Sequence, residues 1–230
     1  MTDTRPAGSR PLTIAIDGPS GAGKGTIARA LAGRLGYRHV DTGAMYRALA
    51  WKALHEGIDL SDEEALASLA ARATFEVGEG HVRIDGDDAA AAIRTPEMDR
   101  AATTVARHPR IREVLVARQR ALGAAGGVVM EGRDIGTVVF PHADVKIFLD
   151  ASAEERARRR ASDPAHSSGA GAAAIQDVAT ALAERDKSDR GRAASPLVQA
   201  QDAVVIDTTH LTVDEAVTRA LAVVNQLRSL

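Results

Sequence analysis

The segment TIAIDGPSGAGKGT, residues 13–26, decides the fold of this chain. A β-branched run leads directly into a glycine-rich turn, and a helical pattern follows over residues 27–35. Gly18, four intervening residues, Gly23 and Lys24 have the spacing of a phosphate-binding loop. In such a loop the glycines let backbone N–H groups point at phosphate oxygens, and the helix adds its N-terminal dipole. We therefore predict that Lys24 is the catalytic cation for the β and γ phosphates of a nucleoside triphosphate. The predicted nucleotide-binding residues are Gly18, Pro19, Ser20, Gly21, Ala22, Gly23, Lys24, Gly25 and Thr26.

Two other glycine motifs fail on spacing. A dinucleotide-binding fingerprint that uses Gly21 and Gly23 would need a third glycine where Thr26 stands. A nucleophile elbow around Ser20 would need glycine in place of Ala22. An ordinary glycine-rich turn is the remaining alternative, but strand, spacing, lysine and helix all agree with a phosphate site.

Gly25 departs from the usual form of this loop, in which a serine or threonine that coordinates magnesium follows the lysine. Thr26 comes one position later, where its hydroxyl can touch a phosphate. Magnesium keeps several waters when it binds nucleotides. We therefore expect a nucleoside triphosphate with Mg²⁺ as the cofactor, the ion being held mainly by nucleotide and water, and we assign no protein residue as a metal ligand.

Four apolar runs have the length of buried parallel strands, and each is followed by a polar or glycine-containing turn and a helical pattern. This rhythm is typical of an α/β fold in which helices cover a central parallel sheet. Ligands of such sheets collect beyond the carboxyl ends of the strands, where this chain is polar at every exit. The predicted strands cover residues 12–16, 127–130, 145–149 and 203–206.

Two segments interrupt the rhythm. Residues 73–94 alternate polar and apolar with three glycines, which predicts a small antiparallel hairpin or three-stranded sheet inserted in the core. Residues 161–174 are rich in Gly, Ser, Pro and Ala between arginine-bearing helical patterns; we interpret them as the tip of a mobile lid rather than a disordered linker. The predicted divisions are a disordered tail at 1–10, core at 11–60, inserted subdomain at 61–105, core at 106–155, lid at 156–190 and core at 191–230.

Composition narrows the class of ligand. The formal net charge is −2 and aromatic residues make up 3% of the 230 residues, so neither a global basic field nor base-stacking platforms indicate a nucleic-acid partner. Arginines still cluster near 107–120, 156–160 and 185–192, which suits a small anionic ligand. The absence of cysteine excludes disulfides and thiolate chemistry, and no stretch approaches the roughly 18 apolar residues of a membrane span. We expect a cytoplasmic monomer with no membrane partner.

Several longer motifs carry a resemblance to a known family. The form G-x-x-G-x-G-K-G-T is similar to the loop of nucleoside monophosphate kinases. Further motifs resemble the bacterial cytidylate kinases, over essentially the whole chain from residue 12 onward: DTGAMYR at 41–47, EGRDIGTVVFP at 131–141, KIFLDAS at 146–152 and ERDKSDRGR at 184–192. The resemblance implies a three-layer P-loop kinase fold with an inserted antiparallel monophosphate-binding subdomain and a mobile lid. It also implies phosphoryl transfer from ATP to CMP or dCMP.

The resemblance implies substrate-binding residues of three kinds. They are Thr42, Arg47 and Arg133 for the monophosphate and its surroundings, Thr103, Arg112 and Asp134 for the cytosine, and Arg185, Asp189 and Arg192 for the ribose and phosphate.

The chemistry of these residues suits the implied tasks. Asp134 can accept from the exocyclic amine of cytosine while Arg112 donates to the ring carbonyl or N3; uracil would present a carbonyl to Asp134 instead. Arg112 lies in the first turn of a predicted helix, where the dipole disfavours cations, so a task is indicated for it, whereas Arg110 is expected to be solvated. A structural ion pair and solvated arginines remain the alternatives. Tyr46 and Trp51 are expected to pack in or near the core.

Arginines before and after the predicted lid are candidates for catalysis. Ser152 and Glu155 have the spacing of a capping box, which would begin a helix. Arg156 and Arg160 would then point together toward the lid and could neutralise the transferring phosphoryl group, as could Arg185. Solvated arginines are the alternative.

Two other functions use the same loop. One is a P-loop kinase for another small acceptor, such as AMP, UMP or shikimate. The other is an ATPase or GTPase switch that acts through a protein partner, but the chain has no guanine-reading N-K-x-D.

Overall fold

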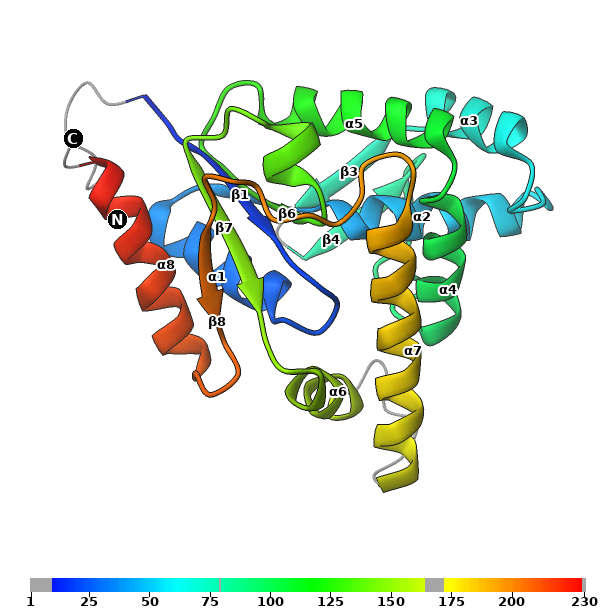
Figure 1. Cartoon of the computed structure of the whole chain (residues 1–230). Helices are drawn as coiled ribbons and strands as arrows, with labels where there is room; N and C mark the ends of the chain where they lie inside the picture. Colours follow the sequence, from blue (N-terminus) through cyan, green and yellow to red (C-terminus); the bar gives the residue numbers. More distant parts are fainter. Residues whose placement is uncertain (1–9, 79, 164–171, 229–230) are drawn as a thin grey trace.

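A five-stranded parallel sheet forms the centre of the molecule (Figure 1). The computed structural model describes residues 10–78, 80–163 and 172–228. The strand order is β2-β6-β1-β7-β8, so the strand that leads into the glycine-rich loop is the middle one. The strands are β1 (Thr13–Asp17), β2 (Arg38–Asp41), β6 (Val128–Gly132), β7 (Val145–Asp150) and β8 (Val204–Asp207).

The four predicted strands are confirmed to within two residues at their ends. Strand β2 was missed, because its sequence RHVD has a single apolar residue and therefore no apolar run. It forms through parallel pairing with β6, which buries Val40 and His39. Pairing in the folded chain overrides a weak local pattern here.

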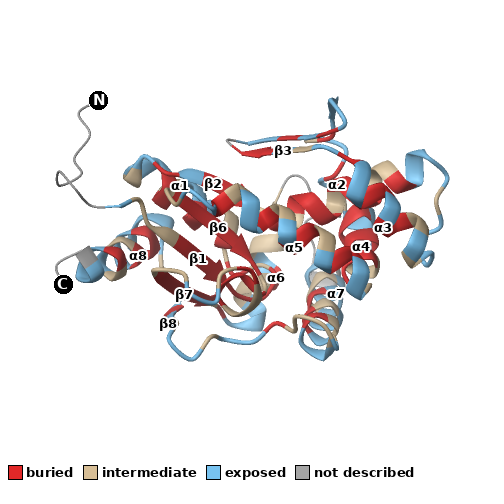
Figure 2. Ribbon diagram, turned by 90° about the horizontal axis from the view of Figure 1, so that it is seen from above, coloured by how far each residue is buried: buried red, intermediate tan, exposed pale blue. Residues whose placement is uncertain are grey.

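Helices cover both faces of the sheet, which confirms the three-layer fold. Ile14 and Ile16 of β1 pack in the apolar cluster with α1 and α8, whereas Ala15 packs in a separate cluster with Val116 of α5. Successive strand residues point to opposite faces, so both faces of this strand are buried, and Figure 2 shows β1, β6 and β7 almost wholly in the colour of buried residues. One face carries α1 (Lys24–Leu35) and α8 (Val213–Arg228), and the other carries α5 (Pro109–Gly123) with a π-helical turn, η1 (Ile135–Val139).

Strand β8 differs from the buried strand that its sequence predicts. It lies at the edge of the sheet and pairs only with β7 among the described strands. Val204 and Val205 are 44% and 49% exposed. The apolar run is real, but its position at the edge leaves these side chains partly in solvent.

The predicted insertion is a three-stranded antiparallel sheet between two helices. Asp85 and Gly86 turn β4 into β5 with φ of 53° and 83°, as a two-residue D-G hairpin turn requires. The unit packs on α2 (Thr42–His55), around buried residues such as Leu49 and Leu69. Its elements are α3 (Glu63–Arg72), β3 (Phe75–Gly78), β4 (His81–Ile84), β5 (Asp87–Asp88) and α4 (Pro96–Val105).

Two helices make up the described part of the predicted lid: α6 (Ala153–Ala161) and α7 (Ala172–Gly191). Ser152 begins α6 by accepting from the Glu155 backbone N–H at 3.2 Å. The reciprocal half of the expected capping box is replaced, since the Ser152 N–H donates to Thr209 Oγ1 and the Glu155 carboxylate binds arginines. Residues 164–171 of the predicted lid tip at 161–174, and residues 1–9 of the predicted tail, lie outside the described residues.

Within the described ranges, no helix combines the length and the apolar character that a membrane crossing requires.

Candidate active site

A cavity of about 770 Å³ opens where the central strands end, between the glycine-rich loop, α2, α4 and the lid helices. This size lies within the usual range of small-molecule sites. All nine predicted substrate-binding residues line it: Thr42, Arg47, Thr103, Arg112, Arg133, Asp134, Arg185, Asp189 and Arg192. Six of the nine predicted nucleotide-binding residues line it as well: Ser20, Gly21, Gly23, Lys24, Gly25 and Thr26. Gly18, Pro19 and Ala22 form the loop but are not among the lining residues.

Two glycines shape the loop, one through a close approach to the backbone of β7 and one through its left-handed backbone conformation. Gly18 has φ 150°, and a Cβ there would lie 2.0 Å from the carbonyl oxygen of Leu149 on β7. Gly23 precedes α1 in the left-handed region, with φ 86°. The loop therefore lies tightly against the sheet, and α1 begins at its end with free N–H groups directed at the cavity.

Lys24 is buried in this loop, with 5% of its surface exposed. Its Nζ donates to the carbonyl oxygen of Pro19 at 2.7 Å. Burial, followed by the nearby Arg133 charge, lowers the pKa of Lys24 from 10.5 to about 7. A bound anion, such as a phosphate group, would therefore stabilise the charged form of Lys24.

Asp17, at the end of β1, holds the start of η1 in place. Its carboxylate accepts the backbone N–H groups of Ile135 and Gly136 at 2.8 and 2.7 Å. Burial raises the pKa of Asp17 from 3.8 to about 6. Sequence reasoning assigned no role to this residue, although its place at a strand exit was a signal. It orients the segment that carries Arg133 and Asp134.

The two residues predicted to read the base form a buried pair. Arg112 Nη2 lies 2.5 Å from Asp134 Oδ2, and the two residues are 3% and 6% exposed. The Arg112 guanidinium also lies over the Tyr46 ring, 5.4 Å from its centroid. Tyr46, expected only to pack, is buried at 8% and lines the cavity beside this pair, whereas Arg110 is exposed as expected.

A second ion-paired group joins the lid to the exit of β6. Arg133 Nε donates to Asp189 Oδ2 at 2.9 Å, and Arg192 Nη1 lies 3.5 Å from Asp189 Oδ1. Helix α7 ends at Gly191, so Arg192 directly follows the helix. Arg185, Asp189 and Arg192, which the sequence analysis grouped together, all line the cavity.

The two threonines of the site use their hydroxyl groups on the backbone. Thr42 Oγ1 donates to the carbonyl oxygen of Glu131 at 2.7 Å, and Thr103 Oγ1 donates to that of Asp99 at 2.8 Å. Each oxygen keeps lone pairs that can accept from a ligand.

Arg156 and Arg160 point to different places, unlike the common direction that the sequence predicts. Arg156 Nη1 donates to the Ser20 carbonyl oxygen at 3.0 Å and is paired with Asp186, which itself accepts the Ser20 N–H. Arg156 thus holds the loop tip against the lid and is not among the cavity-lining residues, whereas Arg160 lines the cavity and is paired with Asp99.

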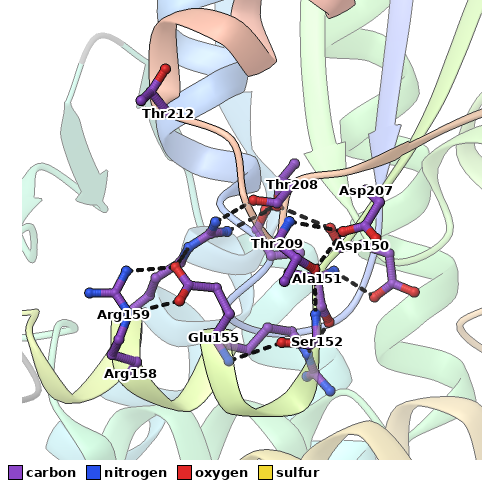
Figure 3. Close-up of polar contacts among 12 residues, drawn as sticks. Asp150, Ala151, Ser152, Glu155, Arg158, Arg159, Asp207, Thr208, Thr209 and Thr212 are labelled. Atoms are coloured by element: carbon purple, nitrogen blue, oxygen red, sulfur yellow. Dashed lines mark hydrogen bonds and ion pairs between the residues drawn. The ribbon is translucent and has the colours of Figure 1, made fainter.

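Arg159 was not predicted, although it belongs to the same arginine run. Its Nη1 donates to Thr208 Oγ1 at 2.9 Å and its Nε to Glu155 at 2.8 Å (Figure 3). Thr208, 1% exposed, also lies 3.0 Å from the Asp150 carbonyl oxygen and 3.3 Å from that of Ala22. This network ties α6 to the loop after β8 and to the glycine-rich loop.

A glycine-rich loop on the middle strand of a parallel sheet, with a buried lysine and facing arginines, defines a P-loop phosphotransferase. A model of the cytidylate kinase family matches residues 14–226. The chain belongs to the cytidylate kinase family and is an ATP-using enzyme of that kind.

Individual relatives agree. The chain is 46% identical over 224 residues to a cytidylate kinase of Solibacter usitatus, with 97% of this chain and 95% of that protein covered. It is 48% identical over 221 residues to a cytidylate kinase of Geobacillus kaustophilus, with 94% and 98% covered. Among solved structures, a gluconokinase from Sinorhizobium meliloti 1021 is similar in fold, with a TM-score of 0.51, 17% identity and 95% of each chain covered.

Proposed function

We propose that this chain transfers the γ-phosphoryl group of ATP to CMP or dCMP, giving CDP or dCDP. The observation that carries the choice of acceptor is the buried Arg112–Asp134 pair beside the glycine-rich loop. Asp134 accepts from the exocyclic amine of cytosine, and Arg112 donates to the ring carbonyl or N3. Uracil would set a carbonyl against a buried carboxylate, which costs a hydrogen bond and adds repulsion.

The remaining residues of the cavity divide between the two nucleotides. The glycine-rich loop and Lys24 bind the triphosphate, and Arg47, Arg133 and Arg185 bind the acceptor phosphate, with Thr42 beside it. Asp189, held by Arg133 and Arg192, accepts from a ribose hydroxyl. Thr103 completes the base site. The support is that these side chains share one cavity.

Magnesium fits the site through a residue that sequence reasoning did not select. A Cβ on residue 25 would lie 2.9 Å from Glu131 Oε1, so the carboxylate occupies the space that a loop serine or threonine would need. Glu131 is buried at 7% and lines the cavity. One carboxylate with nucleotide oxygens and waters is a usual environment for Mg²⁺. We propose that Glu131 holds the ion, which would offset charge on the β and γ phosphates.

The protein then acts by position and charge rather than by covalent catalysis. Lys24, Arg160 and Arg185 offset charge on the transferring group, and Arg156 keeps the loop tip in place. We propose that the insertion at 61–105 closes on the acceptor and the lid at 156–190 on both nucleotides. Closure excludes water, which would otherwise hydrolyse ATP.

A coupled assay of ADP formation tests the proposal, with CMP, dCMP, UMP, AMP or no acceptor, and with or without a magnesium chelator. We expect turnover with CMP and dCMP, little with UMP or AMP, and none without magnesium. ADP formation that does not depend on an acceptor would overturn the proposal in favour of a nucleotide switch. The monomeric state and the cytoplasmic location stay predictions, the first testable by light scattering.

A further inference from the structure

A carboxylate from the insertion lies at the centre of the arginine cluster. Asp99 belongs to the first turn of α4 and is 9% exposed. Arg185 Nη1 of α7 lies 3.1 Å from Asp99 Oδ1, and Arg47 Nη1 of α2 lies 3.8 Å from the same oxygen. Arg160 of α6 is paired with Asp99 Oδ2. One carboxylate therefore gathers three arginines from three different helices.

These cations are crowded. Burial, followed by the charge of Arg185, lowers the pKa of Arg160 to about 10, and burial, followed by the charge of Arg133, lowers that of Arg185 to about 10. Each arginine also faces a carboxylate of its own: Arg47 Nη2 lies 2.9 Å from Asp41 Oδ2, and the charges of Asp163 and Asp189 act on Arg160 and Arg185. Asp99 is the carboxylate that all three share, and bringing the three cations together without it would be costly.

We propose that Asp99 is an internal counter-ion that stands in for the acceptor phosphate when the site is empty and competes with it for Arg47, Arg160 and Arg185. The inference rests on the proposed function, because these arginines are the ones assigned to the acceptor and to the transferred group. Asp99 is a positioning residue, since it acts on the substrate through the arginines.

The carboxylate resembles a phosphate in what it offers. It presents two oxygens and one negative charge, whereas a phosphate monoester presents three free oxygens and up to two charges. The arginines therefore prefer the substrate, but each must first leave or share Asp99. Acceptor binding is therefore weaker than it would be if the arginines had no internal partner. The affinity is reduced in proportion to the fraction of molecules in which the arginines are released from Asp99.

The same contacts join two units of the molecule. Helix α4 belongs to the inserted unit, and α6 and α7 belong to the lid. Asp99 thus joins the lid and the insertion across the cavity. When the acceptor phosphate binds, the arginines contact the phosphate in place of Asp99, so the substrate then joins the lid to the insertion.

The substitution Asp99→Asn keeps the shape of the side chain and removes its charge. We expect CMP to bind about tenfold more tightly, measured by calorimetry without ATP. We also expect the empty variant to unfold at a lower temperature than the wild type, and inorganic phosphate to raise its unfolding temperature more than that of the wild type. Unchanged or weaker CMP binding, with a phosphate response equal to that of the wild type, would mean that Asp99 only supports the structure.

Two controls separate the counter-ion from general charge. Glu97→Gln removes an exposed carboxylate from the same first turn of α4 and is expected to change CMP affinity less than twofold. Equal tightening in both variants would overturn the proposal. Asp99→Glu keeps the charge and is expected to keep the wild-type phosphate response.

The design stays informative if a variant is unstable or if the acceptor is not CMP. Should Asp99→Asn unfold at room temperature, millimolar inorganic phosphate is expected to restore the fold, and failure to do so, while Asp99→Glu folds, contradicts the proposal. The response to phosphate needs no nucleotide. If the wild type does not turn over CMP, the proposed function is wrong, but the phosphate response still tests the role of Asp99.

Discussion

Lys24 is a cation buried where its charge is costly. Burial, followed by the nearby Arg133 charge, lowers its pKa from 10.5 to about 7. A bound triphosphate favours the charged form, so ATP binding takes up a proton above neutral pH. The free energy of unfolding has the opposite dependence: between these two pKa values the unfolded chain binds more protons, so stability rises with pH.

The affinity of the wild type for ATP with magnesium is therefore expected to fall as the pH rises from about 7 to about 9, by up to about tenfold per pH unit. Fluorescence titration with a labelled ATP analogue measures it. Lys24→Arg stays charged and is expected to give a flat profile over this range. Lys24→Met is expected to abolish turnover while the protein stays folded. An equal slope in the wild type and Lys24→Arg would assign the pH dependence to another group.

Asp134 is buried beside Arg112 and lines the cavity, and in the proposed function it decides which pyrimidine is accepted. Asp134→Ala is expected to reduce the preference for CMP over UMP by about 1–3 kcal/mol, the usual cost of a lost buried hydrogen bond to a charged group. The ratio of kcat/KM values for the two acceptors measures it. Arg110→Ala changes an exposed arginine of the same helix as Arg112 and is the control. An unaltered ratio in Asp134→Ala would place the base reader elsewhere.

At the scale of elements, the segment after β8 attaches the lid to the glycine-rich loop. Thr208 is 1% exposed and its hydroxyl connects Arg159 of α6 with the carbonyl oxygens of Asp150 and Ala22 (Figure 3). Hydrogen bonds from Arg159 to the Thr208 hydroxyl and carbonyl oxygen join α6 to this segment.

Thr208→Val replaces the hydroxyl by a methyl group of similar size. We expect the free energy of unfolding to fall by about 1–3 kcal/mol, since buried polar groups lose their partner. Urea denaturation measures it, together with the KM for ATP, which is expected to rise. Thr208→Ser keeps the hydroxyl and is expected to stay closer to the wild type. A fully stable Thr208→Val protein with unchanged KM would show that the network is dispensable.

At the scale of the whole molecule, the two sides of the cavity rest on two different apolar clusters. The glycine-rich loop rests on the cluster of α1, α8 and the sheet, which includes Leu31. The side that we propose for the acceptor rests on the cluster of α2 and the insertion, which includes Leu69. Both leucines are fully buried.

Leu69→Ala and Leu31→Ala are each expected to lower the free energy of unfolding by about 2–5 kcal/mol, as cavities in close-packed cores do. Their kinetic effects should differ. Leu69→Ala is expected to raise the KM for CMP more than that for ATP, and Leu31→Ala the reverse. Urea denaturation and steady-state kinetics provide the two measurements. Identical kinetic effects would mean that the clusters do not support the substrates separately.

Much of this molecule follows from local sequence. The strand, loop and helix of residues 13–26 are neighbours along the chain, so spacing alone predicts the phosphate site. The alternation at 73–94, with its three glycines, predicts the antiparallel insertion in the same way, and the apolar runs predict the parallel sheet. The nine substrate-binding residues came from matching longer motifs, and the structure brings all of them to one cavity.

Other features depend on groups that only the folded chain brings together. Strand β2 has no apolar run and exists because β6 pairs with it. Glu131 is proposed to hold Mg²⁺ because its carboxylate fills the space beside Gly25. This contact between residues distant in sequence cannot be predicted from either residue alone. Asp99 resembles any acidic residue in a first helical turn until three arginines from distant segments converge on it. Periodicity and spacing describe neighbours in sequence, whereas charge and steric exclusion act between neighbours in space, so the loop of residues 13–26 could be predicted and its surroundings could not.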